Sequence, residues 1–404
     1  MLYFIGDRGN TWKTLRYYSF PPFSFLYMRS KNFYARRMIL ADINDRSLPN
    51  SIDGDWLFVP SLRPKEVFPL FASSELGIDL GTMNVRLFSQ TKGIVFDEPA
   101  AVAYNRHTGK LMAIGQQAKQ MIGKAPAHIE VTYPLQNGVI ADFERAKMLL
   151  QQVFKQVGNP LGLAFKKPSV VMSVPFHATS VERRSFYEIA QHCGAKHIHF
   201  IEEPVAAAIG ADLPVSEPVA NVVVHLGAGK TEAAIISLGG VVACRSLRIG
   251  GNRLDEDIIQ YVRQRYNLLI GEQTAEQVKL AIGSAPGIDA DQTVTIHGRN
   301  LVTGFLKAIS LDPLEVQTAM KESLLQIAEA IRAVLEECPA ELSGDIIDHG
   351  VVLTGGGALL HGIEQWLGAE LHVPVHVAPN PSETVAIGTG KALRAMPKRL
   401  SAAL

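Results

Sequence analysis

The chain is poor in cysteine and in long apolar runs, and each shortage excludes a class of protein. Its three cysteines, Cys193, Cys244 and Cys338, are far apart and form no close Cys and His grouping of the kind that binds a metal. A sparse, odd cysteine count suits a reducing cytoplasm rather than a disulfide framework. No uninterrupted apolar stretch approaches the roughly 18 residues of a membrane span, and the small-residue cleavage pattern of a signal peptide is missing, which argues against export.

The chain also lacks an excess of charge of either sign. Lysine plus arginine and aspartate plus glutamate both number 39, so no global field favours nucleic acid, although a local basic face is not excluded. The 404 residues are enough for two domains, and the hydrophobic content of 47% supports sizeable cores. Composition therefore predicts a soluble, globular protein with no nucleic-acid partner.

The stretch from Val222 to Leu238 organises the rest of the chain. It reads VVVHLGAGKTEAAIISL, a buried-looking strand joined to a second strand by a turn that only small residues can make. Gly227 and Gly229 permit backbone angles and a close approach that a side chain would block, so their N–H groups can converge on a phosphate. A plain β-hairpin is the more common explanation of this pattern when the stretch is taken alone.

A second copy of this hairpin strengthens the phosphate interpretation. Leu76 to Phe88 reads LGIDLGTMNVRLF, in which Ile78 to Gly81 aligns with Val224 to Gly227. Two similar hairpins so far apart predict two like-folded halves that each offer a glycine turn to one ligand in the cleft between them. A third element, Leu353 to Leu360, runs from a strand into three glycines, which suit close passage of a flat group such as a purine.

These elements carry a resemblance to a known family. Together with Ile201-Glu202-Glu203-Pro204, they resemble the actin, heat-shock chaperone and sugar kinase ATPase superfamily, and within it the bacterial MreB family of actin-like rod-shape proteins. The likeness runs from about Glu75 to Leu393. Its specificity is high because further stretches match: Phe96 to Pro99, Met121 to Lys124, Gly138 to Phe143, Val181 to Arg184 and Ile201 to Gly210.

The resemblance implies an α/β fold of two actin-like domains, each a mixed sheet flanked by helices with a smaller inserted subdomain. The first domain would span 75–218, with its minor subdomain at about 100–145, and the second 219–404, with its minor subdomain at about 255–326. Spacing and cap residues predict helices at Gln116 to Ile122, Phe143 to Val157, Ser180 to Cys193 with an N-cap at Ser180, Leu254 to Tyr266, Glu322 to Leu335 and Ser382 to Ala392.

The resemblance also implies a site for ATP and Mg²⁺ between the halves. Asp79 would help to hold Mg²⁺ indirectly, Glu203 would orient the water that attacks the terminal phosphate, and Glu276 and Lys279 would reach the ribose. The other nucleotide-binding positions lie in the three glycine elements: Gly81, Thr82, Asn84, Gly227, Ala228, Gly229, Lys230, Thr231, Gly355, Gly356 and Gly357. From the residues alone, Asp79 is also explained as a turn residue, Glu203 as a helix cap, and Glu276 with Lys279 as a surface ion pair.

Three positions of the second hairpin depart from the family pattern. His225 stands where the family has Asp, Ala228 where it has a middle Gly, and Lys230 where it has Thr. The Asp normally arranges magnesium-bound water and the Thr helps to place the attacking water. Lys230 instead brings a cation toward the phosphates, where unit charges about 4 Å apart interact by roughly 4 kcal/mol at an effective dielectric near 20. We therefore expect nucleotide binding with slow or absent hydrolysis and with Mg²⁺ dependence in question; alternatively, Lys230 swings to solvent and His225 merely packs.

Two further segments carry predictions about the membrane. Residues 1–74 hold no helix or strand periodicity, yet the first 40 contain eleven of the chain's 30 aromatic residues. They are interpreted either as a basic, aromatic arm for a membrane surface or, as we favour, as a poorly ordered extension. Leu161, Leu163 and Phe165 precede two lysines, and the resemblance implies that this apolar loop inserts into the membrane inner surface. A buried connection between a helix and a strand is the alternative.

The resemblance finally implies a function. It is that of a cytoplasmic, ATP-binding cytoskeletal protein, peripheral at the inner face of the cell membrane, that organises cell-wall synthesis and rod shape. Its expected partners are further copies of itself in a filament, the inner membrane surface and cell-wall elongation membrane proteins. The alternative is a nucleotide-gated chaperone or scaffold that does not polymerise. A small-molecule kinase is less well supported, because the sequence has no evident catalytic Asp or sugar-binding insertion.

Overall fold

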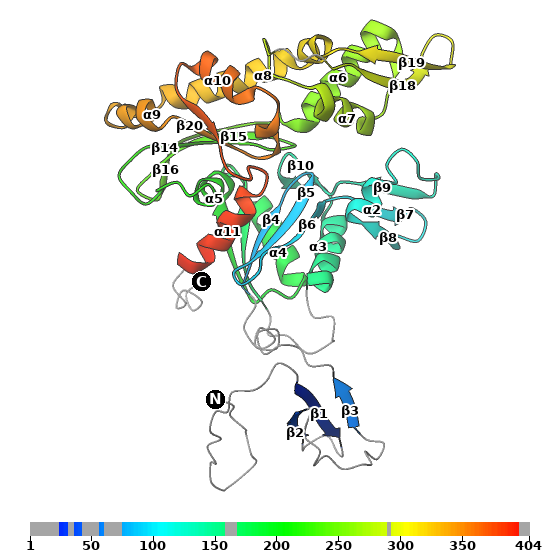
Figure 1. Ribbon diagram of the computed structural model, residues 1–404, viewed down its shortest axis with the longest axis vertical. Coiled ribbons are helices and arrows are strands. Elements are labelled where there is room, and N and C mark those ends of the chain that lie inside the picture. The colour runs from blue at the N-terminus through cyan, green and yellow to red at the C-terminus, as the bar shows by residue number, and fades with distance from the viewer. Residues whose placement is uncertain are drawn as a thin grey trace. The chain divides into compact units, whose positions relative to one another are not determined.

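The computed structural model describes residues 75–157, 168–288 and 292–395, together with the backbone of three strands nearer the N-terminus (Figure 1). The chain divides into two units, residues 1–72 and 73–404. In the first unit β1 (Ser24–Ser30) pairs antiparallel with both β2 (Arg36–Asp42) and β3 (Trp56–Val59). Local periodicity predicts no strand in this stretch, because its residues show no regular alternation of apolar and polar side chains. The apolar loop of Leu161, Leu163 and Phe165 lies outside the described residues.

A five-stranded sheet is the core of the first half of the second unit. The strand order is β13-β12-β4-β5-β6. The antiparallel strands are β4 (Glu75–Leu80), β5 (Asn84–Ser89) and β6 (Gly93–Pro99), and the strands parallel to β4 are β12 (Ser169–Val174) and β13 (His197–Glu202). The sheet packs with α3 (Phe143–Val157) and α4 (Ser180–His192), whose apolar faces bury Leu149, Leu150, Phe186 and Ile189 against Ile78, Leu87 and Met172.

The second half repeats this sheet. Its order is β16-β15-β14-β20-β21, again three antiparallel strands followed by two parallel ones. The strands are β14 (Asn221–Leu226), β15 (Thr231–Ser237), β16 (Gly240–Leu247), β20 (Val351–Thr354) and β21 (Val375–Val377). The helices of this half are α6 (Gly251–Tyr266), α8 (Pro313–Glu336), α9 (Ser343–His349) and α10 (Ile363–Leu371). The matching order confirms the predicted internal repeat.

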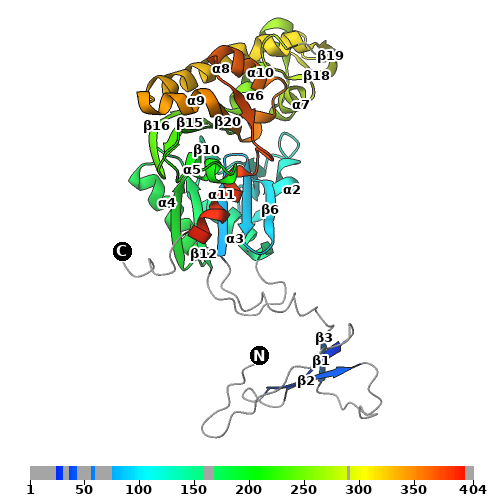
Figure 2. The same ribbon diagram turned by 60° about the vertical axis from the view of Figure 1, so that its left-hand side comes forward.

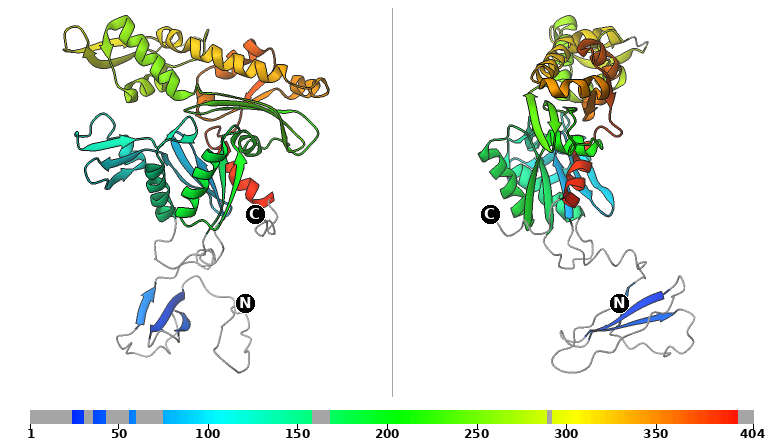
Figure 3. Two further views of the ribbon diagram at one scale, coloured as in Figure 1. Left: turned by 180° about the vertical axis from the view of Figure 1, so that it is seen from behind. Right: turned by 90° about the vertical axis from the view of Figure 1, so that its left-hand side faces the viewer.

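Each half carries smaller elements beside its sheet. In the first half these are β7 (Val102–Asn105), β8 (Leu111–Ile114), α2 (Gly115–Lys119), β9 (Ile129–Thr132) and the short hairpin β10 (Leu135–Gln136) with β11 (Val139–Ile140). In the second half they are β17 (Leu268–Leu269), α7 (Glu272–Ile282), β18 (Val294–Asn300) and β19 (Leu306–Leu311), with 3₁₀ turns η2 (Ala340–Leu342) and η3 (Gly356–Leu359). Figures 1 and 3 show α2 and the β18–β19 hairpin at the same end of their respective halves.

Two helices cross where the halves join. The helix α11 (Thr384–Ala395) follows the second sheet but packs on β4 and on α5 (Glu203–Gly210) of the first half (Figure 2). A Cβ added at Gly388 would clash with the carbonyl of Ala206, and one at Gly390 would clash with the Phe88 ring. The backbones therefore approach as closely as the two glycines of this helix predict. Among the described residues, no helix is long and apolar enough to cross a membrane.

The helix ends correct several sequence predictions. The bounds of α3 are as predicted, but the N-cap of α4 is Thr179 rather than Ser180, since Thr179 and Glu182 form a reciprocal capping box. The helix α8 begins at Pro313, well before the predicted Glu322, because Asp312 caps it in the same way with Glu315. Three other helices differ from their predicted bounds by only a few residues. The helix α2 ends at Lys119, α6 begins at Gly251, and α11 spans Thr384–Ala395.

Candidate functional site

The two glycine turns have the same backbone geometry. The N–H of Gly81 donates to the Asn84 carbonyl at 3.0 Å, and the N–H of Gly227 donates to the Lys230 carbonyl at 2.9 Å. A Cβ at either glycine would lie 2.9 Å from that same carbonyl oxygen. Only glycine fits such a turn without displacing the backbone, which is why both copies of the motif keep it at this position.

Three turns meet at one place, which we call the turn junction: Thr82, Asn137, Gly138, Gly229 and Lys230. A Cβ at Gly229 would lie 2.8 Å from Thr82 Oγ1 and 2.9 Å from the Asn137 nitrogen. The N–H of Gly138 donates to Thr82 Oγ1 at 2.9 Å. A Cβ at Gly138 would lie 2.6 Å from Lys230 Cε. The β4–β5 and β14–β15 turns of the two halves therefore contact each other through the β10–β11 turn.

The turns also present free backbone donors. The N–H groups of Thr82 and Met83 in the first turn, and of Ala228 and Gly229 in the second, donate to no other residue in the described parts of the chain. Adjacent N–H groups of this kind are the donors with which glycine turns bind anions. The junction therefore has the chemistry of a phosphate site contributed by both halves.

A buried charge cluster adjoins the turn junction. Lys230 Nζ lies 2.9 Å from Glu203 Oε2 and 2.7 Å from Glu232 Oε2, and His225 Nε2 lies 3.2 Å from Glu203 Oε1. Lys230 is only 4% exposed and His225 9%. The alternative in which Lys230 points to solvent and His225 merely packs is therefore wrong. Glu203 does not cap α5 either, since the N-cap is Glu202, which makes no side-chain cap hydrogen bond.

The protonation states follow from burial and from the neighbouring charges. Burial alone would lower the pKa of Lys230, but Glu203 and Glu232 outweigh it, so its pKa is raised and the ammonium group stays charged. Burial would raise the pKa of Glu203, but Lys230 and His225 lower it below its usual value. Burial lowers the pKa of His225, although Glu203 opposes the shift; its Nε2 lies 3.2 Å from Glu203 Oε1 and its Nδ1 lies 3.1 Å from the Thr354 hydroxyl oxygen.

Asp79 lies at the end of β4, close to the first turn. Ser173 Oγ donates to Asp79 Oδ1 at 3.2 Å, and Arg86 approaches Asp79 Oδ2 at 3.9 Å while it pairs with Asp97 at 3.0 Å. Burial raises the pKa of Asp79 to about 7, although Arg86 opposes the shift. Asp79 is thus a buried carboxyl group rather than an exposed turn residue.

The third glycine element packs against the end of β14. Gly355 has φ of 83°, and a Cβ there would clash with the backbone of Leu226. A Cβ at Gly357 would lie 2.8 Å from Leu226 Cβ, whereas one at Gly356 would meet nothing within 4 Å. The element therefore joins β20 to η3 beside the second turn and leaves open space at its middle glycine.

Glu276 and Lys279 do not form the surface ion pair considered as an alternative. Lys279 Nζ pairs with Asp255 at 2.9 Å and donates to the Gly251 carbonyl at 2.7 Å. Glu276 pairs with Lys119 of α2, at 2.8 Å, and thus links the smaller elements of the two halves. Burial raises the pKa of Asp255 to about 6, with Lys279 opposing the shift.

Sequence reasoning missed several residues of the site. Glu232 is entirely buried in β15 between Thr231 and Ala233, and no local pattern marks it. Arg86 occupies an ordinary half-buried position in the alternating pattern of β5. The sequence therefore does not reveal that its side chain approaches Asp79. A signal for the third turn was present, because Asn137-Gly138 between two short strands is a strong hairpin indicator.

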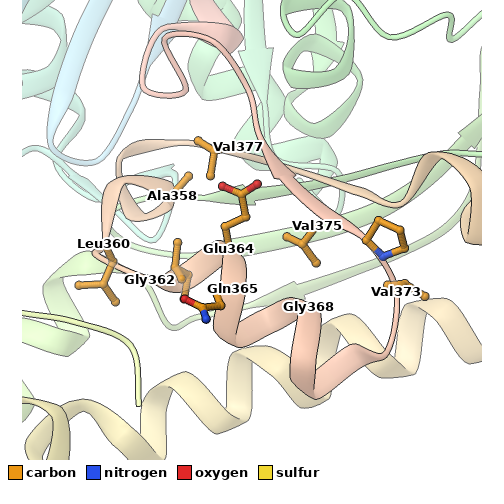
Figure 4. Close-up of a pocket in the computed structure, with 11 residues that line it drawn as sticks. Ala358, Leu360, Gly362, Glu364, Gln365, Gly368, Val373, Val375 and Val377 are labelled. Carbon is orange, nitrogen blue, oxygen red and sulfur yellow. The ribbon is translucent and has the colours of Figure 1, made fainter. Parts of the chain in front are cut away.

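A separate open groove of about 550 Å³ lies beside α10 and β21. Figure 4 shows Ala358, Leu360, Val375 and Val377 around the Glu364 side chain. The lining is largely aliphatic, and its one carboxylate lies 3.7 Å from His376. Its character is that of a contact surface rather than of the charged turn junction.

The repeated sheet and the paired glycine turns define an actin-like protein. Two solved structures of MreB5 from Spiroplasma citri share this fold at 33% sequence identity. The structure bound to ADP has a TM-score of 0.78 and covers 82% of this chain and 99% of its own. The structure bound to AMPPNP has a TM-score of 0.75 and covers 80% of this chain and 98% of its own. The predicted two-domain α/β fold is confirmed.

The chain belongs to the MreB/Mbl family. The family described as MreB/Mbl protein matches residues 73–401. The cell shape-determining protein Mbl of Bacillus subtilis (strain 168) is 43% identical over 324 residues, which cover 80% of this chain and 97% of the relative. The cell shape-determining protein MreB of Escherichia coli (strain K12) is 46% identical over 327 residues, 80% of this chain and 93% of the relative. The predicted resemblance is confirmed.

Proposed function

We propose that this chain is a cell-shape protein that binds ATP at the turn junction and assembles into filaments. The single observation that carries the nucleotide site is the meeting of two equivalent glycine turns, one from each half, with free N–H donors in both. The MreB5 structures bound to ADP and AMPPNP support the choice of an adenine nucleotide. The relatives named cell shape-determining proteins support the biological role.

Different residues around the junction would contact the phosphates, the purine and the ribose of the nucleotide. The turn N–H groups, with Gly81, Thr82 and Gly229 beside them, would take the phosphates. The open space at Gly356 would take the purine, and the end of α7 with Lys279 would lie toward the ribose. The proposed domains, 75–218 and 219–404, would then each contribute one turn.

Hydrolysis at this site is proposed to be slow. Glu203 is the residue that would orient water, but one of its oxygens is paired with Lys230 and the other with His225. A carboxylate whose pKa is lowered by two such partners is a weak base, and neither oxygen is free to position a water molecule. The bound nucleotide would therefore persist for longer than in a relative with a free carboxylate here.

An exposed apolar tip supports self-association. The β18–β19 hairpin ends in Phe305 and Leu306, which are 76% and 88% exposed, with Val302 also exposed. Figures 1 and 3 show this hairpin well away from α10, beside which the aliphatic groove lies. A tip and a groove at different places on one half suit a head-to-tail contact between copies, which propagates into a filament.

The remaining proposals concern location. By family resemblance, the filaments would lie at the inner face of the cytoplasmic membrane, with the loop of Leu161, Leu163 and Phe165 in the interface and with cell-wall elongation membrane proteins as partners. Apolar side chains followed by lysines suit an anionic membrane surface.

Sedimentation with and without ATP tests the filament function. We expect protein that pellets with ATP at micromolar concentration and stays in the supernatant without nucleotide. Material that binds ATP but remains monomeric well above micromolar concentration would instead identify the non-polymerising scaffold or chaperone. Equilibrium binding of a fluorescent ATP analogue, measured on the same sample, separates a failure to bind from a failure to assemble.

A further inference from the structure

The carboxylates of the buried charge cluster already lie beside a fixed cation. Glu203 and Glu232 share Lys230 between them, and Asp79, near the first turn, lies 3.9 Å from Arg86, which pairs more closely with Asp97. In the described parts of the chain, no group of three or more His, Cys, Asp or Glu side chains is placed to hold a metal ion. The only histidine of the cluster, His225, has both ring nitrogens engaged, by Glu203 and by Thr354.

This donor set does not fit Mg²⁺. The ion prefers six oxygens in near-octahedral order and is held by one or two carboxylates together with phosphates and water. Here a divalent cation would compete with an ammonium and a guanidinium group for the same carboxylates. Two positive charges a few ångströms apart in a poorly hydrated site repel each other, so the charged Lys230 disfavours a metal ion at these carboxylates.

Lys230 has the properties that a resident cation needs. Its ammonium group lies within ion-pair distance of both Glu203 and Glu232. Its side chain packs over Gly138 at the junction, within the turn whose neighbouring N–H groups are free. The two carboxylates keep it charged throughout the neutral pH range.

We propose that nucleotide binding at this junction needs no divalent cation, because the ammonium group of Lys230 already occupies the place between the carboxylates where a divalent cation would have to bind. The inference rests on the proposed nucleotide-binding function and deepens it. It also assigns Lys230 two effects, since the same contact that displaces the metal holds Glu203 in an ion pair.

The test is equilibrium binding of a fluorescent ATP analogue to the full chain, in excess EDTA and in excess Mg²⁺. We expect the two dissociation constants to agree within about threefold. In Lys230→Thr, Glu203 and Glu232 lose their cation, so binding should weaken at least about tenfold in EDTA and recover when Mg²⁺ is added. Lys230→Arg keeps the charge and should keep binding in EDTA. Lys147→Thr, on the outer face of α3, is the matched control and should bind as the natural chain does.

The outcomes are distinct. Binding of the natural chain only in the presence of Mg²⁺ would overturn this inference and uphold the nucleotide-binding function. An absence of binding under both conditions would overturn that function and the inference with it. The comparison on the natural chain decides the question even if Lys230→Thr fails to fold, which circular dichroism would reveal.

Discussion

The ammonium group of Lys230 lies 2.9 Å from Glu203 Oε2, and this contact joins the two halves of the molecule. Lys230 stands at the end of the second hairpin turn, whereas Glu203 begins the helix that follows the first sheet. The side chains are almost completely buried, so the pair interacts at low effective dielectric. Where the family resemblance implies a Thr and an Asp in this hairpin, this chain has Lys230 and His225, which both lie beside the Glu203 carboxylate.

The first prediction concerns hydrolysis. The natural chain should release little phosphate, whereas His225→Asp with Lys230→Thr should free Glu203 and raise the rate about 10²-fold, the lower end of the range for general-base catalysis. Phosphate release from ATP-loaded protein in the presence of Mg²⁺ measures this. Adding Glu203→Gln to the double variant should remove the gain. Equal rates for the natural chain and the double variant would show that other groups compensate for these two positions.

The second prediction concerns stability. Lys230→Met leaves Glu203 and Glu232 buried without a cation, and removal of one partner from a buried ion pair costs about 3–5 kcal/mol. Urea unfolding monitored by circular dichroism measures the loss. Lys147→Met removes a surface lysine paired with Glu144 and should cost no more than about 0.5 kcal/mol. A loss as small for Lys230 as for Lys147 would mean that the buried carboxylates simply take up protons.

The third prediction concerns pH. Because burial raises the pKa of Asp255 from 3.8 to about 6, the folded state binds this proton more tightly than the unfolded state does. The resulting stability is fully present below about pH 4 and is lost as the pH rises through 6, a change of roughly 3 kcal/mol. Asp255→Asn should flatten the unfolding free energy over that interval by this amount. A pH profile that Asp255→Asn leaves unchanged would contradict this assignment.

The fourth prediction distinguishes two neighbouring residues at the start of α4. Thr179 accepts a hydrogen bond from the Glu182 N–H at 3.2 Å and completes a capping box, whereas Ser180 is the first residue inside the helix. Thr179→Ala should therefore cost about 1 kcal/mol of stability, and Ser180→Ala should cost almost nothing. Chemical denaturation of the two variants decides between the positions, and a larger loss at Ser180 would restore the N-cap that sequence reasoning predicts.

The fifth prediction concerns assembly. Phe305→Ser with Leu306→Ser removes the apolar tip of the β18–β19 hairpin without touching the core, so ATP binding should persist while the sedimented fraction falls severalfold. Val181→Ser, 71% exposed on α4, removes an exposed apolar side chain elsewhere and should sediment normally. Undiminished sedimentation of the tip variant would exclude the hairpin from the contact between copies.

The sequence alone determined the repeated architecture. Gly81 and Gly227 could be recognised because a turn that closes on the carbonyl three residues later excludes every side chain, and this constraint is local. The helix α3 was found with its correct bounds because its apolar spacing is regular over fifteen residues. The first residues of helices were predicted less accurately. The N-caps Thr179 and Asp312 are defined by side-chain hydrogen bonds, and neighbouring residues are also plausible caps in the sequence.

Only the tertiary structure decided what the unusual residues do. The sequence favours Lys230 as a cation near the phosphates and leaves a solvent-exposed charge as the alternative. The fold brings Glu203, 27 positions earlier in the chain, and Glu232 of the adjoining strand to the same ammonium group. Pairings of this kind depend on which strands are neighbours and on how much water the packing excludes. Both are properties of the assembled sheets, and no local pattern of residues encodes them.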